Sequence, residues 1–226
     1  SLCFSGCVQL GSIGLPDSID EIWPLSFENT NLHSVILPRR LKKVGRGLFS
    51  ECPNLQSVVI PDGVTDIEEK AFFKCPSLQT IAIPQNVASI GKNAFEGCTS
   101  LSTVSIPNGV TKIRKETFKD CTSLVSVDIP PSVVCIGRSA FMNCSQLTAD
   151  SIPTGIPKIG EDAFSGCADS LASMYAKEEI GYALNGTCGE TISWSYDPNE
   201  EVLSITGDGP IEDDPESWIH LMYYAK

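Results

Sequence analysis

Apolar residues recur along this chain with a period of 23 residues. In most periods a phenylalanine stands three residues before a cysteine, and a leucine stands three residues after it. A fixed period in the twenties is typical of a solenoid, in which each repeat forms one coil. One coil cannot bury its own apolar side, so the coils must stack to share a continuous core. The aligned phenylalanines are Phe49, Phe72, Phe95, Phe118, Phe141 and Phe164, and the cysteines are Cys52, Cys75, Cys98, Cys121, Cys144 and Cys167.

A short strand follows each leucine in the pattern aliphatic-x-Ile-Pro, as in Val58-x-Ile60-Pro61. The two apolar positions lie two residues apart, which places both on one face of a strand and the residue between them on the other. Proline cannot donate a ladder hydrogen bond, so it terminates the strand. Two degenerate copies come first, and the second is one residue short and lacks the cysteine. Seven prolines, from Pro16 to Pro153, thus predict seven strand-bearing repeats whose strands form a parallel sheet.

The pattern divides the chain into three parts. Residues 1–170 are predicted to form a solenoid of about seven repeats, and residues 171–185 a capping segment with a short helix over the last coil. Residues 186–226 form a small β-element or part of a following module. Within it, residues 192–196 and 202–206 alternate like strands around a turn, which predicts a hairpin.

The unit Phe-x-x-Cys-x-x-Leu-x-x-Val-x-Ile-Pro-x-x-Val-x-x-Ile-Gly-x-x-Ala-Phe resembles the BspA-like leucine-rich repeats of bacterial surface proteins. The resemblance covers residues 3–170 and is clearest from Gly91 to Phe95. The expected fold is a leucine-rich-repeat solenoid: a right-handed α/β-type superhelix, strand-rich with short turns of helix, its parallel sheet on the concave side. The tail from Gly186 to Gly209 resembles a small β-element found beside such repeats in gut-bacterial proteins. Members of the family are surface or secreted proteins, many proposed to bind host or bacterial partners.

Charge and composition exclude several classes of function. The net charge of −12 repels a phosphate backbone, so nucleic acid is not expected as a partner. No stretch approaches 18 apolar residues, and the first residues lack the features of a signal peptide, so we expect no membrane insertion and a mature or excised segment. His33 and His220 are the only imidazoles, and neither accompanies a nucleophile motif. We therefore expect no enzyme activity and no cofactor.

The cysteine ladder is interpreted as a column of small core residues rather than as disulfides or a metal site. Cysteine is among the most buried residue types. Equivalent positions in stacked coils direct their side chains in parallel, which opposes bonding, and no Cys-x-x-Cys pair is present. Cys3, Cys135 and Cys188 stand off the ladder and remain open as reactive or paired thiols.

Two surfaces are candidate binding sites. Solenoids usually bind through the outward side of the sheet, although small neutral residues there could also serve solubility alone. A basic run in an acidic chain could attract anionic glycans or acidic proteins, and its alternative is a solvated edge. The sheet candidates are Gln56, Val59, Gln79, Ala82, Ser102, Ser105, Val125 and Asp128, and the basic run is Arg39, Arg40, Lys42, Lys43 and Arg46.

The resulting hypothesis is a monomeric, non-catalytic protein, extracellular or on the cell surface, that is adhesin-like and recognises a protein or glycan of a host or neighbouring bacterium. One alternative is a passive spacer that presents another domain. A glycan-hydrolase module is disfavoured, because paired-carboxylate chemistry needs clustered acids and only Asp128 is acidic along the central outward column.

Overall fold

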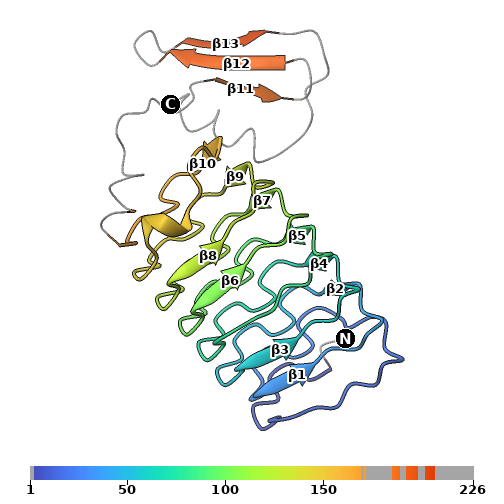
Figure 1. Cartoon of the computed structure of the whole chain (residues 1–226). Coiled ribbons are helices and arrows are strands. Elements are labelled where there is room, and N and C mark those ends of the chain that lie inside the picture. The colour runs from blue at the N-terminus through green and yellow to red at the C-terminus, as the bar shows by residue number, and fades with distance from the viewer. Residues whose placement is uncertain (1–2, 169–170, 172–184, 189–191, 198–201, 207–226) are drawn as a thin grey trace. The chain divides into compact units, whose positions relative to one another are not determined.

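The computed structural model describes residues 3–168, 171, 185–188, 192–197 and 202–206 (Figure 1). Contacts divide the chain into two compact units, Ser1–Ala176 and Lys177–Lys226. The first unit is a stack of coils with two columns of short parallel strands, and the second contains an antiparallel sheet. The predicted capping segment lies outside the described residues except for Leu171, which is buried.

The first strand column consists of the aliphatic-x-Ile-Pro segments. It contains β1 (Ser34–Ile36), β3 (Ser57–Val59), β6 (Thr103–Ser105) and β8 (Ser126–Asp128). β1 pairs with β3 and β6 pairs with β8, both in parallel, and equivalent residues of successive repeats face each other. In each strand the middle valine is buried and its two neighbours are exposed. The parallel pairing and the alternation confirm the prediction for these repeats.

Strands do not form in all seven predicted repeats, and this part of the prediction was wrong. Residues 79–83 keep the buried and exposed alternation without strand pairing, and Leu10–Leu15 of the first coil form no strand. In the seventh repeat a short 3-10 helix, η1 (Ala149–Ser151), replaces the strand. The reason lies in the sequence, because Asp150 occupies the position at which the other repeats bury an aliphatic side chain, and a carboxylate cannot be buried there without a partner.

The second strand column follows the proline turn of each coil. Its members are β2 (Lys43–Val44), β4 (Asp66–Ile67), β5 (Ser89–Ile90), β7 (Lys112–Ile113), β9 (Cys135–Ile136) and β10 (Lys158–Ile159). They pair in parallel as β2-β4-β5 and β7-β9-β10. In the first five of these strands the last residue points into the core, and the first points outward.

The third side of each coil carries the phenylalanine, and the expected turns of helix do not form there. Lys70 and Lys74 have positive φ angles of 58° and 52°, which interrupt a right-handed helix after one turn. Their backbone N–H groups donate to the carbonyls of Lys92 (3.0 Å) and Glu96 (2.7 Å) in the next coil. These donors link coils instead of closing a helix, which explains why the repeats lack α-helix within residues 3–168.

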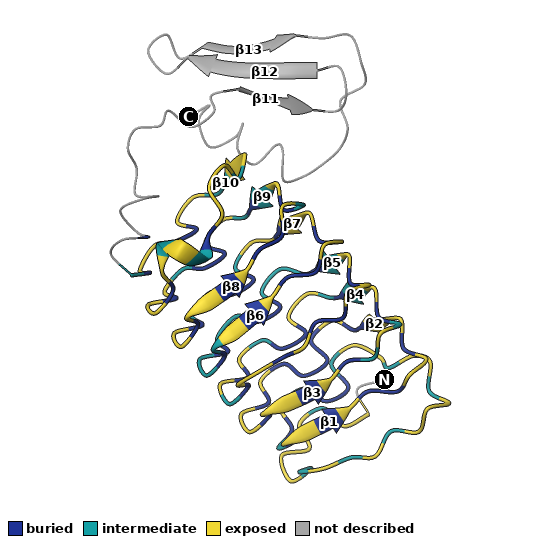
Figure 2. Ribbon diagram, viewed as in Figure 1, coloured by how far each residue is buried: buried dark blue, intermediate teal, exposed yellow. Residues whose placement is uncertain are grey.

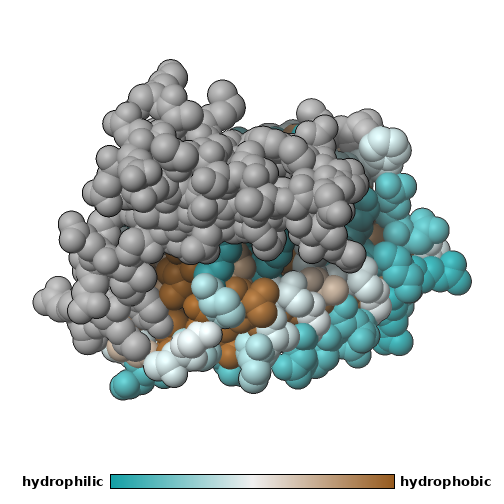
Figure 3. All heavy atoms as spheres, turned by 90° about the horizontal axis from the view of Figure 1, so that it is seen from above, coloured by the Kyte–Doolittle hydropathy of each residue, from teal (hydrophilic) through white to brown (hydrophobic). Residues whose placement is uncertain are grey.

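The core runs through the whole stack (Figure 2). Eight phenylalanines from Phe4 to Phe164 stack with centroids 5.2–5.7 Å apart and ring planes within 14° of parallel. Seen from above in Figure 3, apolar residues of the described part gather in the interior, with hydrophilic residues at the rim. The first coil is the exception, since Phe4 is 39% exposed whereas Phe49 and Phe95 are fully buried.

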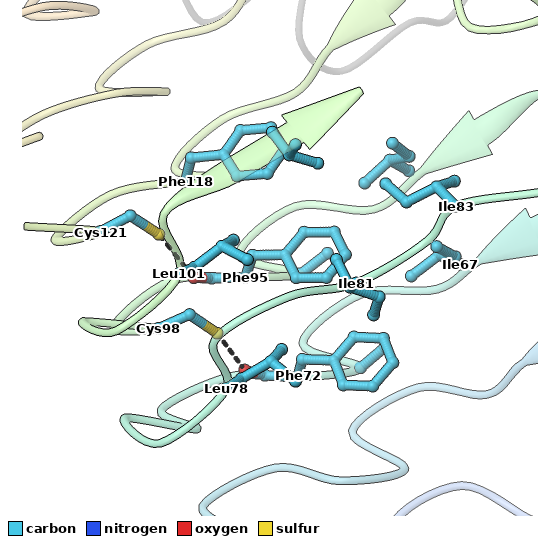
Figure 4. Close-up of a cluster of buried hydrophobic side chains, with 14 of the residues drawn as sticks. Ile67, Phe72, Leu78, Ile81, Ile83, Phe95, Cys98, Leu101, Phe118 and Cys121 are labelled. Atoms are coloured by element: carbon cyan, nitrogen blue, oxygen red, sulfur yellow. Dashed lines mark hydrogen bonds between the residues drawn. The ribbon is translucent and has the colours of Figure 1, made fainter. Parts of the chain in front are cut away.

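The cysteines form a ladder beside the phenylalanines (Figure 4). All six are buried, as predicted, and all six are free thiols. The Sγ atom of Cys98 donates to the carbonyl of Phe72 at 3.2 Å, and that of Cys121 donates to the carbonyl of Phe95 at 3.1 Å. The same bond recurs from Cys52 to Cys167. Thr30 stands in place of a cysteine in the short repeat, and its hydroxyl donates to the carbonyl of Phe27.

The second unit contains three antiparallel strands, β11 (Asn185–Cys188), β12 (Ile192–Asp197) and β13 (Val202–Thr206). β12 pairs with β13 with Tyr196 opposite Leu203, and β11 pairs with the other edge of β12. Strands thus occupy both segments predicted to alternate. The turn proposed between them lies outside the described residues.

Candidate binding face

The outward side of the first strand column is a continuous face built from three parallel rows of side chains. The strands alternate, so the residues on either side of each buried valine point outward together. A third row precedes the strands. We name these rows together the uncharged face; they are Ser34, Ser57, Thr80, Thr103 and Ser126; Ile36, Val59, Ala82, Ser105 and Asp128; and His33, Gln56, Gln79, Ser102 and Val125.

The structure brings all eight predicted sheet residues together on this face. Seven are exposed, and Ser102 is partly buried. Val59 lies opposite Ile36 of the preceding coil, and Ser105 donates a hydrogen bond to Asp128 of the next coil at 2.9 Å. Ile36 and Val59 are 70% and 57% exposed, which places an aliphatic pair at the N-terminal end of the face. His33 lies on the strand face, as predicted, and its Nδ1 lies 3.2 Å from the carbonyl oxygen of Gly11.

The row of hydroxyls from Ser34 to Ser126 was not predicted. Alternation in the sequence indicated outward positions between and before the apolar residues, but the strand begins at the serine itself. The signal was present, because five successive repeats carry Ser or Thr immediately before the buried valine or isoleucine. A core position would instead show aliphatic residues.

The charged face is the outward side of the second strand column from β2 to β9. It consists of Lys42, Lys43, Thr65, Asp66, Ala88, Ser89, Thr111, Lys112, Val134 and Cys135. Four of these ten residues are charged, against one of the fifteen on the uncharged face. A hollow of about 280 Å³ opens at this side, lined by acidic and basic groups that include Glu68, Glu69 and Arg114.

The basic run does not form one patch. Its five residues are exposed but extend around the coil from the turn after β1 to the turn after β2. Arg39 lies 3.6 Å from the carboxylate of Asp17, in the preceding coil, and Lys43 lies 3.0 Å from that of Glu68, in the next. A hydrogen bond to Glu68, with its charge, raises the pKa of Lys43. The run is therefore partly neutralised by acids of both neighbouring coils, which favours the interpretation of a solvated edge.

Four of the six ladder thiols cannot act as nucleophiles near neutral pH in the folded chain. Burial raises the pKa of Cys98 to about 12 and that of Cys167 to about 11. Burial also raises the pKa of Cys121 and Cys144. The thiolate is the reactive form, so these four cysteines are structural.

Two further observations limit the chemistry of the described part of the chain. No three His, Cys, Asp or Glu side chains among its residues come together as metal ligands. None of its helices has the length and apolar character needed to cross a bilayer.

Comparison with known proteins identifies the family. The model of the BspA type leucine rich repeat region matches residues 1–99 and 65–186, with six copies. The chain belongs to this family, which confirms the resemblance drawn from the repeat pattern. A search of curated proteins finds no match.

Several solved structures of bacterial leucine-rich-repeat proteins resemble the chain. The protein from Treponema pallidum is 25% identical, with a TM-score of 0.49, over 59% of this chain and 73% of its own. A leucine rich cell surface protein from Faecalibacterium prausnitzii is 32% identical, with a TM-score of 0.41, over 63% of this chain and 46% of its own. A protein from Eubacterium ventriosum is 26% identical, with a TM-score of 0.49, over 68% and 58%. The chain therefore spans about half the length of the latter two.

Proposed function

We propose that this chain is a non-catalytic binding protein, located at the cell surface or outside the cell, that recognises a host or bacterial macromolecule through the uncharged face. Membership of the BspA-type family supports an adhesin-like role. The observation that carries the proposal is the uncharged face itself. It is a regular surface with one charged residue among fifteen, it exposes Ile36 and Val59, and it belongs to a strongly acidic chain.

A passive spacer would need only solubility at this face. Exposed aliphatic side chains oppose solubility, whereas charged ones promote it. The chain places four charged residues on the second strand column and only Asp128 on the first, so solubility does not account for the uncharged face. A negative binding result would favour the interpretation as a passive spacer.

The test is binding of the purified chain to an array of extracellular proteins and glycans at physiological salt. Val59→Asp is compared with Val134→Asp, because both valines are exposed (57% and 47%) but lie on different strand columns. We expect saturable binding that Val59→Asp abolishes and Val134→Asp preserves.

A third variant replaces Arg39, Arg40, Lys42 and Lys43 with Glu. Loss of binding in this variant alone would move the site to the basic run. Absence of binding to the whole array would overturn the proposal and favour the spacer. Turnover in a glycan-hydrolysis screen would overturn its non-catalytic part.

A further inference from the structure

One row of hydroxyls on the uncharged face, from Ser34 to Ser126, is free of internal partners, whereas Ser102 and Ser105 donate to neighbouring coils. Within the described residues, the side chains of Ser34, Ser57, Thr80, Thr103 and Ser126 make no hydrogen bond. Hydroxyls in the turns behave differently: Ser77 donates to the carbonyl of Pro53 at 2.6 Å, and Thr99 donates to that of Pro76 at 3.3 Å. The turn hydroxyls join coils, and the hydroxyls of the row from Ser34 to Ser126 do not. Their structural contribution is therefore small.

Amides and aliphatic groups flank this row on either side. Gln56 and Gln79 are exposed on one side, and neither side chain makes a hydrogen bond within the described part of the chain. Ile36, Val59 and Ala82 are exposed on the other side. Hydroxyl and amide groups can both donate and accept hydrogen bonds. The face thus offers hydrogen-bond partners in rows, beside an apolar strip.

The near absence of charge on the uncharged face indicates the charge of its ligand. The chain carries 16 Lys and Arg and 28 Asp and Glu, yet Asp128 is the one charged residue among the fifteen of the face. An uncharged surface gives no electrostatic attraction to a polyanion or polycation. The net charge of −12 further opposes an anionic ligand. The complementary ligand is itself uncharged.

The regular spacing of the face indicates a linear, periodic ligand. Paired strands repeat every 4.7–4.9 Å or so, and each coil offers one hydroxyl at the same position. That spacing is close to the length of one sugar in an extended, β-linked polysaccharide. Such a chain presents hydroxyls along its edges and C–H groups on its ring faces, which matches the two kinds of group on the protein.

We propose that the uncharged face binds one extended chain of an uncharged, β-linked polysaccharide, with about one sugar for each coil. This inference rests on the proposed function and names its ligand. A folded protein is a poorer fit, because standard interfaces bury about 800 Å² per partner and are anchored by Trp, Tyr or Arg. The fifteen residues of the face include none of these three. Affinity would instead accumulate from weak contacts repeated along the stack.

Calorimetry with soluble β-linked gluco-, manno- and N-acetylchito-oligosaccharides of two to six sugars tests the proposal. We expect one of these series to bind, with an affinity that rises with each added sugar as another coil is engaged. Hyaluronan and polygalacturonate serve as anionic probes, and we expect neither to bind.

Variants locate the site without altering the core. Thr80→Val removes one hydroxyl from the face, and Thr111→Val is its matched control on the charged face, where Thr111 is equally an exposed strand-column residue. The triple variant Ser57→Ala, Thr80→Val, Thr103→Val is expected to weaken binding at least about tenfold, since each lost hydrogen bond contributes modestly. Thr111→Val should bind as the unmodified chain does. Urea unfolding midpoints confirm that each variant is folded.

The outcomes separate the inference from the function on which it rests. Length-dependent binding that the triple variant weakens and Thr111→Val preserves supports both. A protein ligand lost in Val59→Asp would overturn the polysaccharide inference and leave the proposed function intact. Oligosaccharide binding that the triple variant does not change would place the site elsewhere and overturn the inference. No binding to any oligosaccharide at millimolar concentration would overturn it as well.

Discussion

The two strand columns rest on the same core and differ on the outside. On the charged face, Lys43 forms an ion pair with Glu68 of the next coil, and the hydroxyl of Thr65 donates to the carbonyl of Lys42 in the preceding coil. On the uncharged face, the hydroxyl row has no partner within the described residues and the aliphatic pair of Ile36 and Val59 is open to solvent. The comparison shows that inter-coil packing does not dictate the outward residues. The charged face uses some of these residues to join coils, and the uncharged face leaves its hydroxyl row without partners among the described residues.

The largest expected effect comes from removing the core that both faces share. Phe95 is fully buried between two stacked rings, so Phe95→Ala should lower the free energy of unfolding by roughly 3–5 kcal/mol, as truncation of a buried aromatic side chain does. Phe4→Ala is the control, because Phe4 is 39% exposed and has one stacked neighbour. Urea denaturation followed by circular dichroism measures both. Equal losses would contradict a shared, continuous core.

The next effect concerns the close approach of neighbouring coils beside the second strand column. A Cβ atom at Gly91 would clash with the backbone nitrogen of Glu69 in the preceding coil, whereas one at Gly14, in the first coil, would meet nothing within 4 Å. Gly91→Ala should therefore destabilise the chain by roughly 1–3 kcal/mol, the usual range for overpacking. Gly14→Ala should leave stability unchanged or slightly raised. Thermal unfolding of the two variants decides the matter, and an unaffected Gly91→Ala would show that the backbone can yield there.

Alkaline pH should destabilise the core that lies beneath both faces. The folded-state pKa of Cys98 is raised by burial from an ordinary value of 9.0 to about 12. Because the pKa is raised in the folded state, the stability contributed by the neutral Cys98 thiol is complete below pH 9. It is lost as the pH rises towards about 12. Cys98→Ala has no thiol to ionise, so its urea midpoint should fall less steeply over this range than that of the unmodified chain. Parallel pH profiles would exclude ionisation of Cys98 as a cause.

The smallest effect concerns the ion pairs of the charged face. Lys43→Glu places a carboxylate next to that of Glu68. It should lower the free energy of unfolding by no more than about 1 kcal/mol, since exposed pairs contribute little. Lys112→Glu is the matched control, because Lys112 has no ion pair within the described residues. The difference between the two variants should shrink in high salt. A difference that persists there would contradict an electrostatic origin.

The sequence predicts most of the solenoid because each repeat carries the same pattern of apolar residues. A buried position that recurs every 23 residues leaves one consistent register, and the phenylalanine, cysteine and leucine ladders follow from it. The failures have local causes. Asp150 breaks the strand of the seventh repeat, and the left-handed residues Lys70 and Lys74 replace the expected turn of helix with bonds between coils. Lysine gives no warning of a left-handed position, but the equivalent positions of other repeats hold Gly97, Asn143 and Gly166, whose residue types tolerate a positive φ angle.

The candidate site was predicted less completely than the core. The eight sheet residues do lie on one face, because alternation along a strand is a reliable guide to direction. The hydroxyl row was missed, since the exact start of a three-residue strand decides whether Ser57 points outward. The basic run looked continuous because its residues are adjacent in sequence, but the chain turns between Arg39 and Lys43. Only the folded coil shows that acids of both neighbouring repeats face them.

The one-residue deletion in the second repeat shows how the array tolerates change. The phenylalanine stack passes from Phe27 to Phe49 without interruption, although only 22 residues separate them. Contacts are made with the adjacent coil alone, so a whole unit removed or duplicated between equivalent positions would rejoin the same set of contacts. The length of the uncharged face can therefore change during evolution by one coil at a time. The residues that each remaining coil presents on the face stay the same.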